Sequence, residues 1–160
     1  MKRLNNERGL TLIELLATIV LISMIGLVAF GILFNGFKTY DRVKVETALR
    51  DEADIIMAEL ISHMYTMKSS DIASKHLTEN EQMNYYLQLH DGGKVGFFEG
   101  KLHLKDKTNL ALQSDQIRLA EETKIYEISD GQFRIVLSLE WTSTGQKLTI
   151  ESEVGIVKDG

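Results

Sequence analysis

Hydrophobic residues follow three different patterns along the chain. Residues 10–34 are almost all apolar, whereas the apolar positions of residues 49–67 recur at spacings of three and four. From residue 85 onward, short segments alternate apolar and polar residues between turn-forming pairs such as Asp130-Gly131. Spacings of three and four place side chains on one face of a helix, and alternation is typical of half-buried strands. The order of these patterns predicts an α+β fold, with a long helix followed by a small antiparallel β-sheet.

The apolar run is long enough to cross a membrane. At about 1.5 Å per helical residue, residues 10–34 span a hydrocarbon core of about 30 Å with some tilt. The only charged residue in the run is Glu14. An ionisable group in a membrane helix costs at least about 2.5 kcal/mol at the bilayer centre and less near the surface, so it needs a partner or a function. The sequence therefore predicts a transmembrane helix in which Glu14 has a role.

The residues around Glu14 form a specific motif. A short basic leader ends at Arg8-Gly9, and the apolar run begins directly after it. The motif consists of the consecutive residues Gly9, Leu10, Thr11, Leu12, Ile13, Glu14 and Leu15. This arrangement resembles the class III signal of type IV prepilins and pseudopilins, and the resemblance covers about the first third of the chain. No subfamily is identified.

The resemblance implies how the chain is processed and used. A membrane-embedded aspartyl prepilin peptidase would cut between Gly9 and Leu10 and methylate the new amino terminus at Leu10. Glu14 would then be the fifth mature residue, which guides filament assembly in that family. The family usually has phenylalanine where this chain has Leu10. Two other interpretations fit the hydropathy. One is a secretory signal peptide, although no A-x-A site closes the run, and the other is a plain signal anchor, which does not explain a glutamate at position 14.

Basic charge in the leader predicts the orientation in the membrane. Lys2, Arg3 and Arg8 outnumber Glu7, so by the positive-inside rule the amino terminus is cytoplasmic and the rest is extracytoplasmic, in a single-pass protein of the cytoplasmic membrane. After assembly the chain would lie in a filament or at the cell surface. Removal of the leader would lower the formal net charge from −5 to −7. The mature chain is acidic, and this opposes strong nucleic-acid binding, which rests on basic patches.

The patterns divide the 160-residue chain into five segments. Residues 1–9 are the leader, 10–34 the transmembrane or filament-core helix, and 35–68 its amphipathic continuation. Residues 69–84 are expected to connect the helix to the sheet of residues 85–160. Six apolar residues form the stripe that would face the sheet as core and not as a cofactor site: Leu49, Ala53, Ile56, Leu60, Met64 and Met67. Strands are expected at 85–89, 95–98, 102–104, 117–119, 124–128, 133–142 and 148–154.

The sequence offers little that indicates catalysis. It has no cysteine, which excludes disulfides and thiolate metal sites, and we expect no cofactor, no metal and no enzymatic activity. His63, His76, His90 and His103 lack metal-ligand spacing. The carboxylates Glu140, Glu151 and Glu153 alternate with apolar residues, as on a solvated face. A catalytic carboxylate pair among them is a weak alternative.

Three functions from different classes remain. The favoured one is a structural subunit, a minor pilin or pseudopilin of a type IV pilus-like, competence or type II secretion filament. The others are a ligand-binding subunit at a filament tip, with DNA, a surface or a secretion substrate as ligand, and a single-pass membrane-anchored sensor domain. The partners implied by the resemblance are prepilin peptidase, other pilin or pseudopilin subunits, the inner-membrane assembly platform and membrane lipid.

Overall fold

The computed structural model describes residues 11–77, 84–105, 107–110 and 114–158, and all structural statements below refer to these residues. A single helix, α1 (Leu12–Thr66), comes first, and a short 3-10 helix, η1 (Ser69–Asp71), follows it. The remaining elements are strands. The chain divides into two compact units, Met1–Val43 and Lys44–Gly160, which are described separately.

The first unit contains the apolar part of α1. Its most apolar 18-residue window has a mean hydropathy of 2.6 and no buried residue, so this helix is long and apolar enough to span a membrane. The hydroxyls of Thr18 and Ser23 donate hydrogen bonds to backbone carbonyls of the preceding turn at 2.8 Å, so neither polar group is left unsatisfied. Lys38 places its ammonium 4.7 Å from the ring centre of Phe34, where the sequence changes from apolar to charged.

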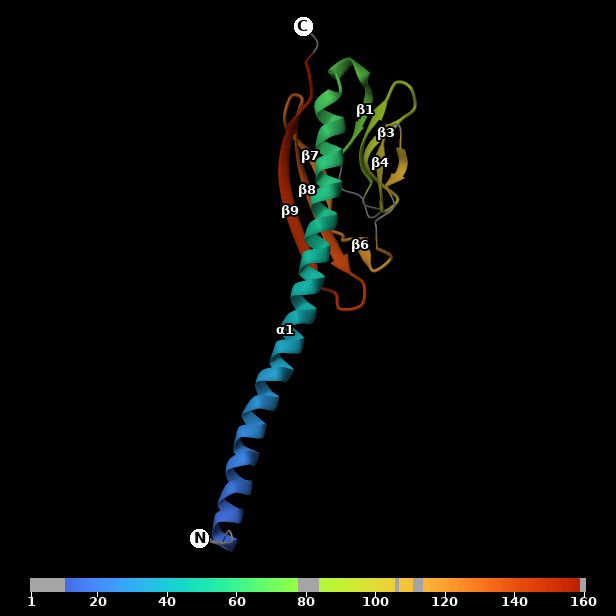
Figure 1. Cartoon of the computed structure of the whole chain (residues 1–160). Coiled ribbons are helices and arrows are strands. Elements are labelled where there is room, and N and C mark those ends of the chain that lie inside the picture. Colours follow the sequence, from blue (N-terminus) through green and yellow to red (C-terminus); the bar gives the residue numbers. More distant parts are fainter. Residues whose placement is uncertain (1–10, 78–83, 106, 111–113, 159–160) are drawn as a thin grey trace, which may run out of the picture. The chain divides into compact units, whose positions relative to one another are not determined.

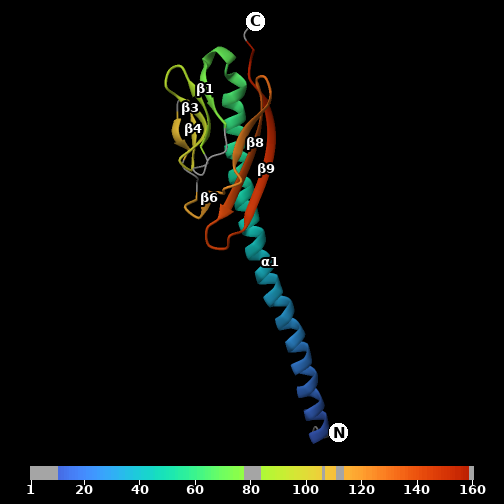
Figure 2. The same ribbon diagram turned by 180° about the vertical axis from the view of Figure 1, so that it is seen from behind.

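The second unit contains two antiparallel sheets. The five-stranded sheet has the order β1 (Ile72–His76), β2 (Tyr85–Leu89), β3 (Lys94–Phe98), β4 (Lys101–Leu104) and β5 (Lys107–Leu110). The four-stranded sheet consists of β6 (Ile117–Leu119), β7 (Lys124–Ser129), β8 (Gln132–Trp141) and β9 (Lys147–Gly155), with β8 paired to the other three. Figures 1 and 2 show the four-stranded sheet against the second half of α1 and the five-stranded sheet beside it.

One hydrophobic core joins the helix to both sheets. All six residues of the predicted stripe are buried, which confirms the face of the helix that the spacing identified. The largest fully buried side chains from the sheets include Phe97 on β3 and Phe133 on β8. On β8, Phe133, Ile135, Leu137 and Leu139 are buried in the core, as predicted, but the alternation in burial is incomplete because Val136 and Ser138 are buried as well.

The segment between the helix and the predicted sheet is more structured than expected. The helix ends at Thr66, two residues before the predicted end, and residues 72–76 form strand β1 within the expected connection. Strand β5 was also not predicted, and the strands form two sheets where one was expected. The carboxyl-terminal segment closes against the helix end, because Val157 donates to the Met67 carbonyl and accepts from Ser69, both at 2.9 Å.

The four-stranded sheet has an interruption where a side chain replaces backbone pairing. Strands β6 and β7 both pair with β8, but the chain leaves the sheet between them at residues 120–123. There the fully buried Thr123 hydroxyl donates to the Ser138 carbonyl at 2.9 Å and accepts from the Ser138 N–H at 3.1 Å. The Ala120 N–H also donates to that carbonyl, at 2.8 Å. The backbone of Ser138 therefore stays hydrogen-bonded on the side of β8 where neither β6 nor β7 reaches it, while β9 runs along the other side.

Candidate functional site

The start of α1 is organised around Glu14. Its Oε2 atom accepts hydrogen bonds from the backbone N–H and from the hydroxyl of Thr11, both at 2.8 Å. In return the Thr11 hydroxyl accepts from the Glu14 N–H at 3.4 Å. Because α1 begins at Leu12, Thr11 is the N-cap residue and Glu14 the third helical residue. The two side chains form a capping box, which satisfies backbone N–H groups that have no partner within the helix.

This geometry gives the Glu14 carboxylate a partner in its own chain. An anion is favourable near a helix amino terminus, where the helix dipole places partial positive charge. The carboxylate is therefore held at the first turn before any neighbouring molecule contributes. The spacing Thr-x-x-Glu ahead of an apolar run is the signal by which this cap can be found in the sequence. Glu14 was identified from the sequence, but the role of Thr11 in holding its carboxylate was not.

The other two residues of the predicted processing site, Gly9 and Leu10, lie outside the described residues. The structure therefore does not test the cleavage between them or the methylation of Leu10. Their positions relative to Glu14 are known from the sequence alone.

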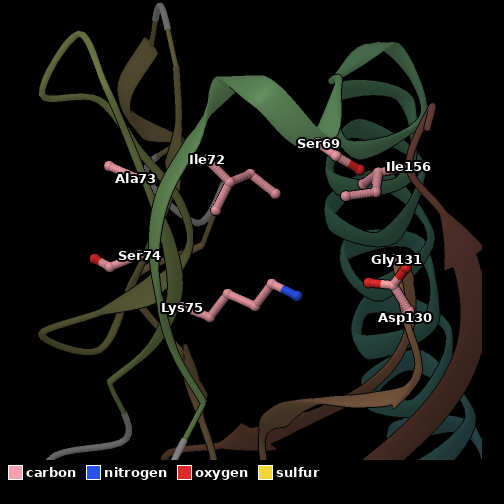
Figure 3. A pocket seen from close by; sticks show the side chains of 8 residues that line it. All are labelled: Ser69, Ile72, Ala73, Ser74, Lys75, Asp130, Gly131 and Ile156. Carbon is pink, nitrogen blue, oxygen red and sulfur yellow. The ribbon is translucent and has the colours of Figure 1, made fainter. Parts of the chain in front are cut away.

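A pocket of about 170 Å³ lies in the second unit, between β1 and the turn that joins β7 to β8 (Figure 3). The Lys75 side chain extends across it, and its ammonium lies 2.6 Å from the Glu127 carboxylate. Glu127 also accepts from the Gly131 N–H at 3.0 Å. The hydrogen bond from Lys75 lowers the pKa of Glu127 below its usual value, and the Gly131 N–H and the charge of Lys75 act in the same direction, against burial and Asp130. The lysine thus links the two sheets, and the pocket presents no free catalytic pair.

The polar residues that could have formed a catalytic carboxylate pair or a metal site are spread over the second unit. On the outer face of the four-stranded sheet, Glu140 pairs with Arg118 at 2.8 Å and Glu153 accepts from Arg134 at 2.9 Å. Glu151 is exposed. These carboxylates therefore lie on the solvated face that alternation predicted. In the part of the chain that the structure describes, no three His, Asp or Glu residues are grouped so that they could hold a metal ion.

Two of the histidines lie closer together than their sequence positions indicate. His76 and His103 belong to the same row of rings on the five-stranded sheet, together with Tyr86 and Phe98. The four residues come from four different strands, so only the pairing of the strands brings them side by side. From the sequence these histidines were expected to be scattered, and no spacing between them indicates that they share one face of a sheet.

Comparison with known proteins adds one finding. Residues 4–30 match the family model described as the prokaryotic N-terminal methylation motif. This range contains the Arg8-Gly9-Leu10 junction, the capping box and most of the apolar run. No curated protein and no solved structure gives a significant match to the chain.

Proposed function

The chain carries the amino-terminal motif of the type IV pilin and pseudopilin family, and from this premise we propose that it is a minor structural subunit of a type IV pilus-like, competence or type II secretion filament. The match over residues 4–30 carries this proposal. The long apolar helix and the α+β fold support it, since they supply a membrane anchor and a pilin-like domain. The motif points to a structural subunit rather than an enzyme.

We further propose how the chain is processed and oriented. The basic leader stays in the cytoplasm, prepilin peptidase cuts between Gly9 and Leu10, and the new amino terminus at Leu10 is methylated. The domain from Lys44 onward is extracytoplasmic. The match implies processing by prepilin peptidase and assembly with other pilins, and it covers the junction itself.

The capping box suggests how Glu14 takes part in assembly. Cleavage would create an ammonium group at Leu10, one residue before Thr11, in the same layer of the membrane as the carboxylate. A carboxylate in a low-dielectric layer is stabilised by a nearby cation, so the Glu14 carboxylate of one subunit would pair with the Leu10 ammonium of the next. Thr11 would keep the carboxylate ordered until that cation arrives. The pairing would set the axial register between subunits.

The first test is proteolytic processing. Coexpression of the full chain with a prepilin peptidase is expected to remove nine residues and leave a methylated Leu10, as read by mass spectrometry. Replacing Gly9 by a bulky residue is expected to block the cut. Cleavage at another place, for example beyond Phe34, would contradict the proposal and favour an ordinary signal peptide.

The second test separates the charge of Glu14 from its capping role. Glu14→Gln keeps an acceptor for Thr11 but removes the charge, whereas Thr11→Val removes the cap hydroxyl but keeps the charge. Glu14→Ala removes both functions, and Glu14→Asp keeps the charge with a shorter reach. Processing after Gly9 and recovery of sheared filaments are measured in the same cells.

We expect all four variants to be inserted and cleaved. Filament recovery is expected to fall sharply for Glu14→Ala and Glu14→Gln, to be intermediate for Glu14→Asp, and to change least for Thr11→Val. If Glu14→Gln assembles as well as the parent chain, the carboxylate charge does not set the register. A simple signal anchor would then explain the helix equally well.

A further inference from the structure

The outer face of the five-stranded sheet carries a row of four rings, one on each of strands β1 to β4. The rings of His76 and Tyr86 stack with centroids 4.6 Å apart. The rings of Tyr86 and Phe98 are nearly perpendicular with centroids 5.2 Å apart, and those of Phe98 and His103 are nearly perpendicular at 5.5 Å. Neighbouring and diagonal positions on adjacent strands produce these contacts, which each stabilise the sheet.

Cations accompany the rings on the same face. The Lys94 ammonium lies 3.1 Å from the ring centre of Phe98 and 4.9 Å from that of Tyr86. Lys101 pairs with Phe98 across the turn between β3 and β4, so both side chains project from this face. We call this surface the ring face; it consists of His76, Tyr86, Lys94, Phe98, Lys101 and His103.

Gly96 keeps β2 and β3 close together beneath the ring face. Its φ is +133°, and an added Cβ would lie 2.3 Å from the Tyr85 carbonyl oxygen and 2.8 Å from the Tyr86 Cα. Only glycine fits this close approach. Because Gly96 lies between Lys94 and Phe98 on the strand, no side chain separates the ammonium from the ring.

Among the described residues, the ring face itself carries only positive formal charge, although the chain as a whole is acidic. No carboxylate among the described residues forms an ion pair with Lys94 or Lys101. Partial burial lowers the pKa of His103, and the charges of Lys94 and Lys101 lower it further, while Glu99 in the adjacent turn raises it. Cations therefore outweigh the nearby carboxylate at this position.

The arrangement of the rings restricts what can bind. Tyr86 stacks on His76, and the Lys94 ammonium lies over the Phe98 ring, so a base could stack on these ring faces only by displacing His76 or Lys94. A ring carries partial positive charge at its edge, and edges together with ammonium groups suit carboxylates. The chemistry of the ring face thus favours an acidic protein surface over a single-stranded nucleic acid, which requires open stacking platforms.

We propose that the ring face is a docking surface for a carboxylate-bearing surface of a neighbouring filament subunit. This inference rests on the proposed function, because a filament places other subunits against each domain. The chain itself shows the kind of surface required: Asp51 and Asp54 are exposed on α1, and the structure describes no ion pair for either.

The test measures binding of fluorescent poly-L-glutamate to the full chain in detergent micelles, by anisotropy. In about 10 mM salt, charges interact over about 30 Å, so weak binding is detectable. The ring-face variant is Lys94→Gln with Lys101→Gln. The control variant is Lys124→Gln with Lys158→Gln, which removes the same charge from residues outside the ring face. Circular dichroism verifies that each variant is folded.

The expected result is binding by the parent chain that weakens about fivefold for each ammonium removed from the ring face, in line with an exposed ion pair. The control variant should bind within about twofold of the parent chain, because it keeps the ring face and changes only the net charge. Absence of binding, or equal losses in both variants, would overturn the proposal. Tighter binding of oligo-dT than of poly-L-glutamate, lost in the ring-face variant, would also overturn it and would identify a nucleic-acid site. The assay needs neither cleavage nor assembly, so its outcome is independent of the processing test.

Discussion

Replacing Thr123 by valine tests the interruption in the four-stranded sheet. Valine matches threonine in shape, so the substitution opens no cavity and removes only the hydroxyl. The Ser138 carbonyl keeps the hydrogen bond from Ala120 at 2.8 Å, but the Ser138 N–H loses its acceptor at 3.1 Å. Ser138 and Thr123 are both fully buried, so water cannot replace that acceptor. A buried unsatisfied donor costs about 1 to 3 kcal/mol, which is the expected loss of unfolding free energy.

The assay is urea unfolding of a fragment that begins near Phe37. The core of the second unit lies entirely downstream of that residue, so the fragment retains it. Trp141 is the only tryptophan in the chain and pairs with β6 at the end of β8, and its fluorescence reports unfolding of this sheet. With a slope of about 2 kcal/mol per M, the midpoint is expected to fall by about 0.5 to 1.5 M.

Thr142→Val is the matched control, one residue beyond β8. The Thr142 hydroxyl donates to the Gln116 carbonyl at 3.1 Å, but Thr142 is exposed and water can take its place. The unfolding free energy of this control variant is expected to fall by no more than about 0.5 kcal/mol. The reasoning fails if Thr123→Val is as stable as the parent fragment, or if the two variants lose the same free energy.

Two further predictions concern charge. Lys75→Gln should lower the unfolding free energy by up to about 1 kcal/mol at pH 7. Because the pKa of Glu127 is lowered in the folded state, the difference between the two proteins should be lost as the pH falls below the ordinary glutamate pKa of about 4.3. Urea unfolding measured across this pH range would show the loss. The fragment that begins near Phe37 should bind duplex DNA weakly, with an affinity that collapses as salt rises, and tight salt-resistant binding in a filter or anisotropy assay would contradict the acidic-subunit interpretation.

The sequence predicts the elements with strong periodicity and misses those without it. The strand at residues 85–89 was predicted with its observed bounds, because apolar and polar residues alternate through it. Strand β1 has the sequence Ile-Ala-Ser-Lys-His and was assigned to a connection. It lies at the edge of the sheet, where few side chains need to be apolar. Its strand geometry comes from pairing with β2, which no local pattern reveals.

The functional residues also differ in whether the sequence alone reveals them. Glu14 was found from sequence because a lone carboxylate in an apolar run is costly, and Thr11 could have been found from its spacing to Glu14. The ring face could not have been found, since residues 76, 86, 98 and 103 meet only through the register of four strands. A shift of one residue in any pair would turn a ring to the opposite face.

The two outer faces of the second unit differ in what they offer a neighbouring molecule. On the four-stranded sheet, Lys147 pairs with Glu122 at 2.6 Å and Arg118 with Glu140 at 2.8 Å, so a neighbour gains little by approaching charges that are already paired. The ring face instead presents ammonium groups without a carboxylate partner among the described residues, on a chain that is acidic in total. A helical filament grows through contacts between two different patches of successive subunits. The cationic ring face of one subunit and an acidic surface of the next would be one such pair of patches. The Glu14 carboxylate of one subunit and the amino terminus of the next would be another.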